Sequence, residues 1–277
     1  MNVGVLARPT VVEWQRQALE NIDKLDGVDI VHTVVDSSLR QGGRTMSVGA
    51  DVINERDSVS LDDLRLFFRT LQEEGLKSVV YADQKLGWVV FGEDEQLRYL
   101  QSKPVEDVDC LGDAAFHDCE PVSAGGAWNT LPDEVTERLG ADCDVVVRFG
   151  FGLLKGDILT APEYGVISSH GSDIRRYRGM GPRITFLNGD RTADVTLQRL
   201  TEDIDGGKVI TMSSRRLPDR PTIDEVFGRI YDLKTRIFAG GIDRLRQPDF
   251  EYIEPESLGE YYAHSRLEKS PVFAGRV

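Results

Sequence analysis

His170 is the first residue whose type and position suggest chemistry. It follows a short apolar run, residues 165–169, and precedes a polar stretch rich in glycine and arginine. This order predicts a strand that ends at the imidazole. Histidine titrates nearest neutral pH, so a ring in this place could donate to a developing oxyanion or move a proton. A lone histidine is more often structural, and that interpretation stays open for His170 by itself.

Asp205 is the second such residue. The alternation at Val195, Leu197 and Arg199 predicts a strand, residues 201–207 predict a turn, and Val209 begins another strand. The hairpin would present the Asp205 carboxylate near its tip, where it could meet the imidazole over one cleft. Aspartate before two glycines is also a common turn former, so a structural role is the alternative.

The elements that must position these two side chains begin with a βαβ pattern. Residues 2–7 and 28–35 are apolar or β-branched and predict strands, and residues 12–23 have helical spacing. Ala7, Arg8 and Pro9 stand where a dinucleotide-binding glycine turn would be, so we expect a Rossmann-like sheet without NAD.

Further elements follow along the chain. We predict a helix over residues 131–139 that Gly140 ends, a buried strand over 144–149, and a long helix over 223–245 after a linker at 216–220. Ser60 opens a predicted helix that ends near Gly75, and residues 78–81 and 87–91 predict a hairpin. No element is assigned from residue 39 to residue 59, and residues 251–277 predict an irregular acidic tail that folds back over the sheet.

Residues 144–210 resemble the amino-terminal domain of the formyltransferase family, which includes methionyl-tRNA, glycinamide ribonucleotide and sugar-nucleotide formyltransferases. The family pattern Asn-x-His-x-Ser-Leu-Leu-Pro-x-Tyr-Arg-Gly aligns without gaps with residues 168–179, and its later Asp-x-Gly turn aligns with residues 205–207. The resemblance implies an α/β fold with an open, mostly parallel Rossmann-like sheet and helices on both faces. The catalytic domain would span residues 1–215 with an insertion at about 39–125, and residues 216–277 would form a C-terminal helix and tail.

The resemblance also implies a reaction: transfer of a formyl group from 10-formyltetrahydrofolate to a primary amine of a small acceptor, with phosphorylated acceptors among the candidates. His170 would stabilise the oxyanion, and Asp205 would help carry the proton of the amine to the leaving nitrogen. No metal is required. Two groups of binding residues are expected: Phe149, Phe151, Gly152, Leu153 and Leu154 at the pterin, and Ser172, Arg175 and Arg178 at the acceptor. A packing turn and a solvated basic loop are the structural alternatives.

Two departures from the family pattern matter. Ser168 replaces the family asparagine that helps bind the carbonyl oxygen, and loss of such a donor typically costs about 10²-fold to 10³-fold in rate. Asp173, Ile174 and Arg175 replace Leu-Leu-Pro, which suggests a different acceptor. Two other functions therefore stay open: a hydrolase that passes the formyl group to water, and a non-catalytic relative that binds a folate, a nucleotide or a protein.

Composition narrows the partners. The 277 residues carry 47 acidic and 33 basic side chains, a net charge of −14, which repels phosphate backbones and makes a nucleic acid partner unexpected. The tail is too short for the β-barrel of the tRNA enzymes. The acidic excess is consistent either with a protein kept soluble in high salt or with an ordinary acidic cytosolic enzyme.

The chain otherwise has the composition of a globular protein. It has no apolar run of the roughly 18 residues that a membrane span needs and no signal-peptide pattern, so we expect a soluble cytoplasmic enzyme of one-carbon metabolism. The three cysteines are too widely spaced for a CxxC pair, which argues against structural zinc or a disulfide framework.

Overall fold

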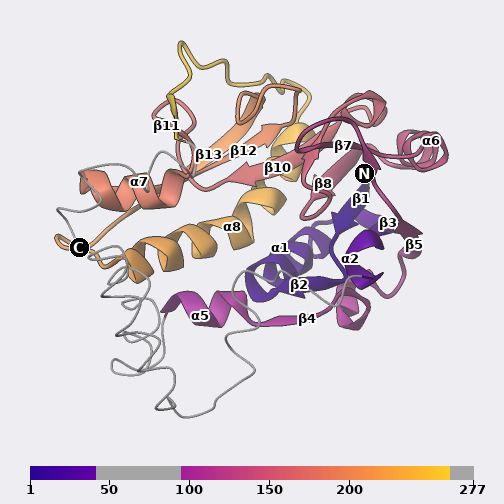
Figure 1. Cartoon of the computed structure of the whole chain (residues 1–277), viewed down its shortest axis with the longest axis horizontal. Coiled ribbons are helices and arrows are strands. Elements are labelled where there is room, and N and C mark those ends of the chain that lie inside the picture. The colour runs from indigo at the N-terminus through magenta and orange to yellow at the C-terminus, as the bar shows by residue number, and fades with distance from the viewer. Residues whose placement is uncertain (42–94, 263–277) are drawn as a thin grey trace.

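The computed structural model of the protein describes residues 1–41 and 95–262 (Figure 1). The predicted helix that begins at Ser60 and the predicted hairpin of residues 78–81 and 87–91 lie outside the described residues, as does the tail beyond residue 262.

A seven-stranded sheet forms the centre of the protein, in the order β13-β12-β10-β8-β1-β3-β5. Five neighbouring strands are parallel: β10 (Val166–His170), β8 (Val145–Arg148), β1 (Asn2–Ala7), β3 (Asp29–Asp36) and β5 (Ala115–Cys119). At one edge β12 (Thr192–Arg199) pairs antiparallel with β10, and β13 (Lys208–Arg216) pairs antiparallel with β12. The predicted fold, a mostly parallel Rossmann-like α/β sheet, is therefore confirmed.

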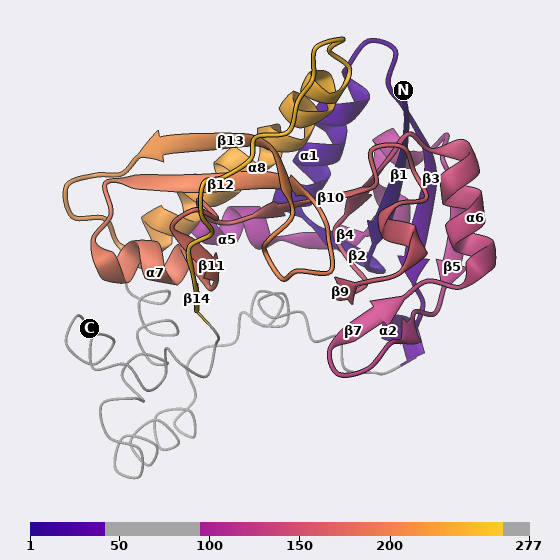
Figure 2. The same ribbon diagram turned by 90° about the horizontal axis from the view of Figure 1, so that it is seen from above.

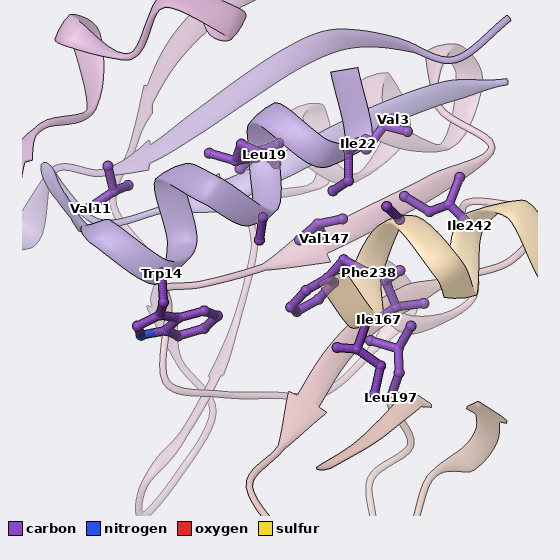
Figure 3. Packing of buried hydrophobic residues seen from close by; sticks show 14 of the residues in the cluster. Val3, Val11, Trp14, Leu19, Ile22, Val147, Ile167, Leu197, Phe238 and Ile242 are labelled. Carbon is purple, nitrogen blue, oxygen red and sulfur yellow. The ribbon is translucent and has the colours of Figure 1, made fainter. Parts of the chain in front are cut away.

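Helices cover both faces of this sheet, because its central strands are apolar on both sides. On one face α1 (Glu13–Asp23) and α8 (Ile223–Leu245) pack side by side (Figures 1 and 2). Figure 3 shows how their buried side chains meet those of the strands, with Leu19, Phe238 and Ile242 of the helices near Val147 and Ile167 of the sheet. On the other face α6 (Asp133–Asp142) contributes Leu139 to a second cluster with Val146 and Val166.

The helix bounds test the sequence predictions. α8 has the predicted bounds, and it begins where Thr222 and Glu225 cap each other, with the Glu225 amide 3.2 Å from the Thr222 hydroxyl. The prediction that Gly140 ends α6 is wrong, because the helix continues to Asp142. A Cβ at Gly140 would lie 2.9 Å from the Cβ of Ala161, so this glycine permits a close approach and does not terminate the helix.

Smaller elements complete the described structure. Residues 38–41, for which no element was predicted, form the short helix α2 (Ser38–Gln41). The others are α5 (Glu95–Leu100), α7 (Gly181–Asn188), 3₁₀ turns at Val105–Asp107, Asp109–Leu111 and Asp157–Leu159, and the strands β2 (Thr10–Val12), β4 (Ser102–Pro104), β6 (Val122–Ser123), β7 (Trp128–Thr130), β9 (Leu153–Leu154), β11 (Tyr177–Gly179) and β14 (Glu260–Tyr262).

Two regions bear on the expected domain division. Within the expected insertion, β5 forms the edge of the main sheet, and Val105 and Leu111 are buried in the same core as α1. The tail folds back as expected over its described part: β14 pairs with β11, and Ile253 bridges to Val209. Although α8 shares its core with the sheet, the boundary between residues 215 and 216 stays a prediction.

Candidate active site

β10 positions His170 and Ser168. Alternate residues of a strand point to the same face of its sheet, so the side chains of Ser168 and His170 lie on the same face as that of Val166. The antiparallel register sets His170 opposite Thr196 and Ser168 opposite Gln198 on β12. Both side chains are nearly closed off, with His170 9% and Ser168 6% exposed. The imidazole therefore lies at the carboxyl end of a central strand, where open α/β sheets bind ligands.

The loop between β12 and β13 brings Asp205 to the imidazole. Asp205 has a positive φ of 48°, a conformation that aspartate tolerates better than most residues. One carboxylate oxygen, Oδ2, accepts a hydrogen bond of 2.8 Å from the Gly179 amide, and Oδ1 lies 3.3 Å from Nδ1 of His170. The two predicted side chains, 35 positions apart in the sequence, therefore meet directly.

The surroundings keep this carboxylate charged. Burial alone would raise the pKa of Asp205, but the hydrogen bond and charge of His170, the Gly179 amide and the Arg148 guanidinium together lower it. With Asp205 ionised, Nδ1 of His170 carries a hydrogen. The other ring nitrogen, Nε2, is buried and has no hydrogen-bond partner within the described structure. With its hydrogen on Nδ1, the ring can accept a proton at Nε2, and Nε2 can donate a hydrogen bond once it carries that proton.

Arg148, which sequence reasoning missed, completes the polar face. It is the last residue of β8, and its Nη2 donates to the Ser168 hydroxyl at 3.2 Å, while its Nη1 donates to the Gly152 carbonyl. Loss of hydration lowers the pKa of Arg148, as does the charge of Arg8, whereas Asp205 acts in the opposite direction. The sequence feature that could have identified Arg148 is its position as a charged residue directly after the apolar run Val145–Val147.

The turn after β8, expected to hold the pterin, is largely closed by packing. Phe149 lies edge-on to the rings of Trp14 and Phe238, with centroids 5.4 and 5.2 Å away. Phe151 and Leu154 are 1% and 2% exposed in the core. Those three side chains contribute to the core, and what the turn offers a ligand is Gly152, which is exposed, the half-buried Leu153 and main-chain groups.

The residues expected at the acceptor have partners of their own. Ser172 is fully buried and donates to the Tyr177 carbonyl at 2.7 Å, so its hydroxyl holds the loop and presents no surface to a substrate. Arg178 donates from Nε to the Gly259 carbonyl at 2.9 Å. Arg175 pairs with Asp173 at 2.7 Å, but half of its side chain is exposed. Of the three, Arg175 presents the most surface to an acceptor.

Comparison with known proteins identifies a family that this part of the chain resembles. Residues 120–240 match the family model described as formyl transferase, and this range includes β8, β10 and the β12–β13 hairpin. The chain carries a formyl transferase domain.

Curated relatives and a solved structure extend the comparison. The chain is 29% identical to a methionyl-tRNA formyltransferase of Fusobacterium nucleatum over 43% of its own length and 38% of the relative's. It is 30% identical to the enzyme of that name from Agathobacter rectalis over 57% and 49% of the two lengths. The chain thus spans half or less of these relatives. An N-formyltransferase from Helicobacter canadensis, solved with folinic acid and dTDP-3-aminofucose, shares the fold with a TM-score of 0.54, 11% identity, and coverage of 99% and 78%.

Lys234 of α8 is a second residue near the site that sequence reasoning missed. Its ammonium lies over the Trp14 ring, 4.9 Å from the centroid. Lys234 itself falls within the residues that match the formyl transferase model. Removal of the ammonium from water lowers the pKa of Lys234 to about 8, and the charge of Arg148 acts in the same direction, against Asp205. A helical spacing of apolar residues does not reveal such an environment, because it depends on which strand ends lie beneath α8.

Among the described residues, 1–41 and 95–262, no helix is both long and apolar enough to span a bilayer. In the same ranges no three His, Cys, Asp or Glu side chains are grouped so that they could hold a metal ion.

Proposed function

We propose that the protein transfers a formyl group from 10-formyltetrahydrofolate to a primary amine of a small acceptor. The observation that carries the proposal is the 3.3 Å contact between His170 and Asp205 within a formyl transferase domain. A carboxylate that orients one nitrogen of an imidazole leaves the other to handle protons.

The residues present fit a formyl-bearing folate. Nε2 of His170 and Nε of Arg148 are both buried and lack hydrogen-bond partners in the described structure. A buried polar nitrogen costs free energy unless it forms a hydrogen bond, and a bound ligand can provide the partner. The carbonyl oxygen of a formyl group can accept hydrogen bonds from such nitrogens. The folate would supply a carbon at the oxidation level of formate.

The chain's own residues would then manage charge and protons. With Nε2 protonated as well as Nδ1, His170 would donate from Nε2 to the oxygen of the formyl group as the amine nitrogen bonds to its carbon. Asp205 would hold the ring in place and stabilise its positive charge. As the bond between the carbon and the folate nitrogen breaks, the pair would pass to that nitrogen the proton that the amine gives up.

Charge favours a small acceptor over a nucleic acid. The net charge of −14 repels a phosphate backbone at long range. A compact amine can instead be recognised locally, and the half-exposed Arg175 is placed on the loop after His170. A small amine that carries a phosphate or carboxylate is the acceptor class that this arrangement favours.

The test is incubation with 10-formyltetrahydrofolate and a panel of primary amines, including amino sugars and phosphorylated amines. We expect formation of tetrahydrofolate that depends on one class of amine and falls about 10²-fold or more in His170→Ala. Formate release without amine would instead indicate a hydrolase. Equal behaviour of the wild type and His170→Ala with every amine would exclude this site as the catalytic centre.

A further inference from the structure

We propose that Arg148 is a further catalytic residue, which together with Ser168 donates hydrogen bonds to the formyl oxygen during transfer. The inference rests on the proposed function, and it gives that oxygen three donors where His170 alone would supply one. It follows from strand register, from the donors left over in the structure and from local charge.

Strand register places the three side chains on one face. The parallel strands β8 and β10 pair Val146 with Val166 and Val147 with Ile167, so the next position sets Arg148 beside Ser168. Val146 and Val166 lie in the same buried cluster, and residues two positions later point to the same side. The 3.2 Å bond from Arg148 to the Ser168 hydroxyl is the direct result, and His170 follows two positions after Ser168.

Several hydrogen-bond donors of Arg148 and Ser168 have no acceptor within the described structure. A guanidinium has five N–H groups, and the observed bonds of Arg148 occupy one on Nη1 and one on Nη2. Its Nε is buried without a partner in the described structure. Because the Ser168 oxygen accepts from Arg148, its own hydrogen is free to be donated. Arg148 and Ser168 thus offer hydrogens on one face, and Nε2 of His170 adds a third when the ring is doubly protonated. The group that matches these donors is an oxygen that only accepts.

Local charge suits an oxygen that becomes negative. Arg148 is largely desolvated, and an arginine keeps its charge in proteins. It faces the carboxylate of Asp205 and the cations of Arg8 and Lys234, so positive charge exceeds negative charge among these groups. A partly desolvated cation stabilises developing negative charge more strongly than a hydroxyl does, because charged hydrogen bonds are about twice as strong as neutral ones.

The same contact explains why a short side chain suits position 168. The guanidinium lies 3.2 Å from the Ser168 oxygen, so the larger side chain of asparagine would compete with it for space. An asparagine could supply the donor itself only if Arg148 were shortened. Ser168→Asn should therefore impair the wild type but restore function to Arg148→Ala.

The test measures binding of two stable folate analogues that differ in the formyl group: 10-formyl-5,8-dideazafolate and 5,8-dideazafolate. We expect Arg148→Met, which keeps most of the side-chain volume, to weaken binding of 10-formyl-5,8-dideazafolate about 10-fold to 100-fold. Its affinity for 5,8-dideazafolate should not change. Ser168→Asn should weaken binding of the formyl compound when Arg148 is present. It should strengthen that binding when it is combined with Arg148→Ala. Titration calorimetry, with thermal unfolding of each variant, provides the measurement.

The outcomes separate the two proposals. If Arg148→Met weakens both compounds equally, or neither, Arg148 is structural and the inference fails while the proposed function stands. If the wild type binds neither compound, both fail. Should Arg148→Met not fold, Ser168→Ala replaces it, since it removes one donor and frees Arg148. A selective loss of the formyl compound supports the inference, and no selective loss overturns it.

Discussion

At the scale of single residues, the contact between His170 and Asp205 has consequences for stability as well as for chemistry. A carboxylate whose pKa is lowered in the folded state stabilises the protein above its unfolded pKa, and this contribution disappears as the pH falls through the lowered value. Asp205 thus connects its role as partner of the imidazole to the pH dependence of folding.

We predict that Asp205→Asn unfolds at lower urea concentration than the wild type at pH 7, and that the two converge as the pH falls below about 3.9, the ordinary pKa of aspartate. The reason is that the wild type then loses the same charge. Under the proposed function the variant should also lose about 10²-fold or more in transfer rate. Asp203→Asn, an exposed acid of the same loop, is the control. A constant difference at all pH values would contradict the prediction.

Lys234 provides a second prediction, of opposite sign. Its folded pKa of about 8 lies below the ordinary lysine value of 10.5, so its charge destabilises the fold fully below pH 8, and the penalty fades as the pH rises toward 10.5. Lys234→Met should raise the melting temperature at pH 7 by about 2–4 °C, with a smaller gain at pH 9.5. Lys208→Met removes an exposed ammonium that also faces a ring, that of Tyr252, and should give no such gain. A gain that does not change with pH would count against a buried charge as the cause.

At the scale of elements, strands and helices with a complete apolar pattern were predictable. β1, α8 and the β12–β13 hairpin followed from local periodicity, because each forms wherever its apolar face finds a partner. Features that depend on a partner distant in the sequence were not predictable. The end of α6 depends on how close Ala161 comes to Gly140, and the role of Arg148 depends on the register between β8 and β10. His170 and Asp205 were predicted because a short family pattern matches the sequence around each of them, and periodicity alone does not single them out.

A chain of hydrogen bonds joins β3, β5 and α6 away from the candidate site. Arg138 donates to Nδ1 of His117 at 2.9 Å, Nε2 of His117 lies 3.0 Å from Nδ1 of His32, and Nε2 of His32 lies 2.9 Å from Asp142. Because Arg138 can only donate, each imidazole carries its hydrogen on Nε2 and both rings are neutral. Burial lowers the pKa of His117, and the charge of Arg138 and a second proton on the neighbouring His32 act in the same direction, against the opposing charge of Glu134.

We therefore predict that stability falls as the pH drops from the ordinary histidine pKa of about 6.5 toward the lowered pKa of His117. At pH values between the lowered pKa of His117 and the ordinary histidine pKa of about 6.5, His117 binds a proton in the unfolded chain but not in the folded state. His117→Gln should be less stable than the wild type at pH 7.5 but should show a shallower loss from pH 7 to pH 5. Urea unfolding at several pH values measures both slopes. Parallel slopes would show that this chain of bonds does not sense protons.

Gly165, which leads into β10, is a sensitive position for the placement of His170. It has a positive φ of 66°, and an added Cβ would lie 2.5 Å from the Leu159 carbonyl oxygen and 2.6 Å from Nε of Arg199. Gly165→Ala should cost about 1–3 kcal/mol or more in unfolding free energy, from strain and displacement together. Gly126→Ala is a matched control, since Gly126 has a φ of 61° and no atom within 4 Å of an added Cβ. Equal costs for both variants would mean that backbone strain alone acts at Gly165.

At the scale of the whole molecule, the candidate site lies where the parallel part of the sheet meets its antiparallel extension. β8 and β10 supply Arg148, Ser168 and His170 toward their carboxyl ends, and the loop between β12 and β13 supplies Asp205. The pairing of β14 with β11 holds the segment whose Gly179 amide fixes the Asp205 carboxylate. Segments from across the described chain therefore contribute to one candidate site, and substitutions in β14 should act on that site through Gly179.

The net charge of −14 is likewise a property of the whole molecule. Like charges repel across the surface, and salt screens this repulsion as the Debye length falls from about 10 Å at 0.1 M to about 3 Å at 1 M. We predict that the melting temperature rises with KCl over this range. The triple variant Glu137→Gln, Asp249→Asn and Glu251→Gln removes three exposed acids, changes the net charge from −14 to −11, and should reduce the dependence on salt. Thermal unfolding of both proteins across the KCl series provides the measurement. If the melting temperature of the wild type falls with salt, or if the triple variant responds as strongly as the wild type, local ion pairs outweigh the overall repulsion in setting stability.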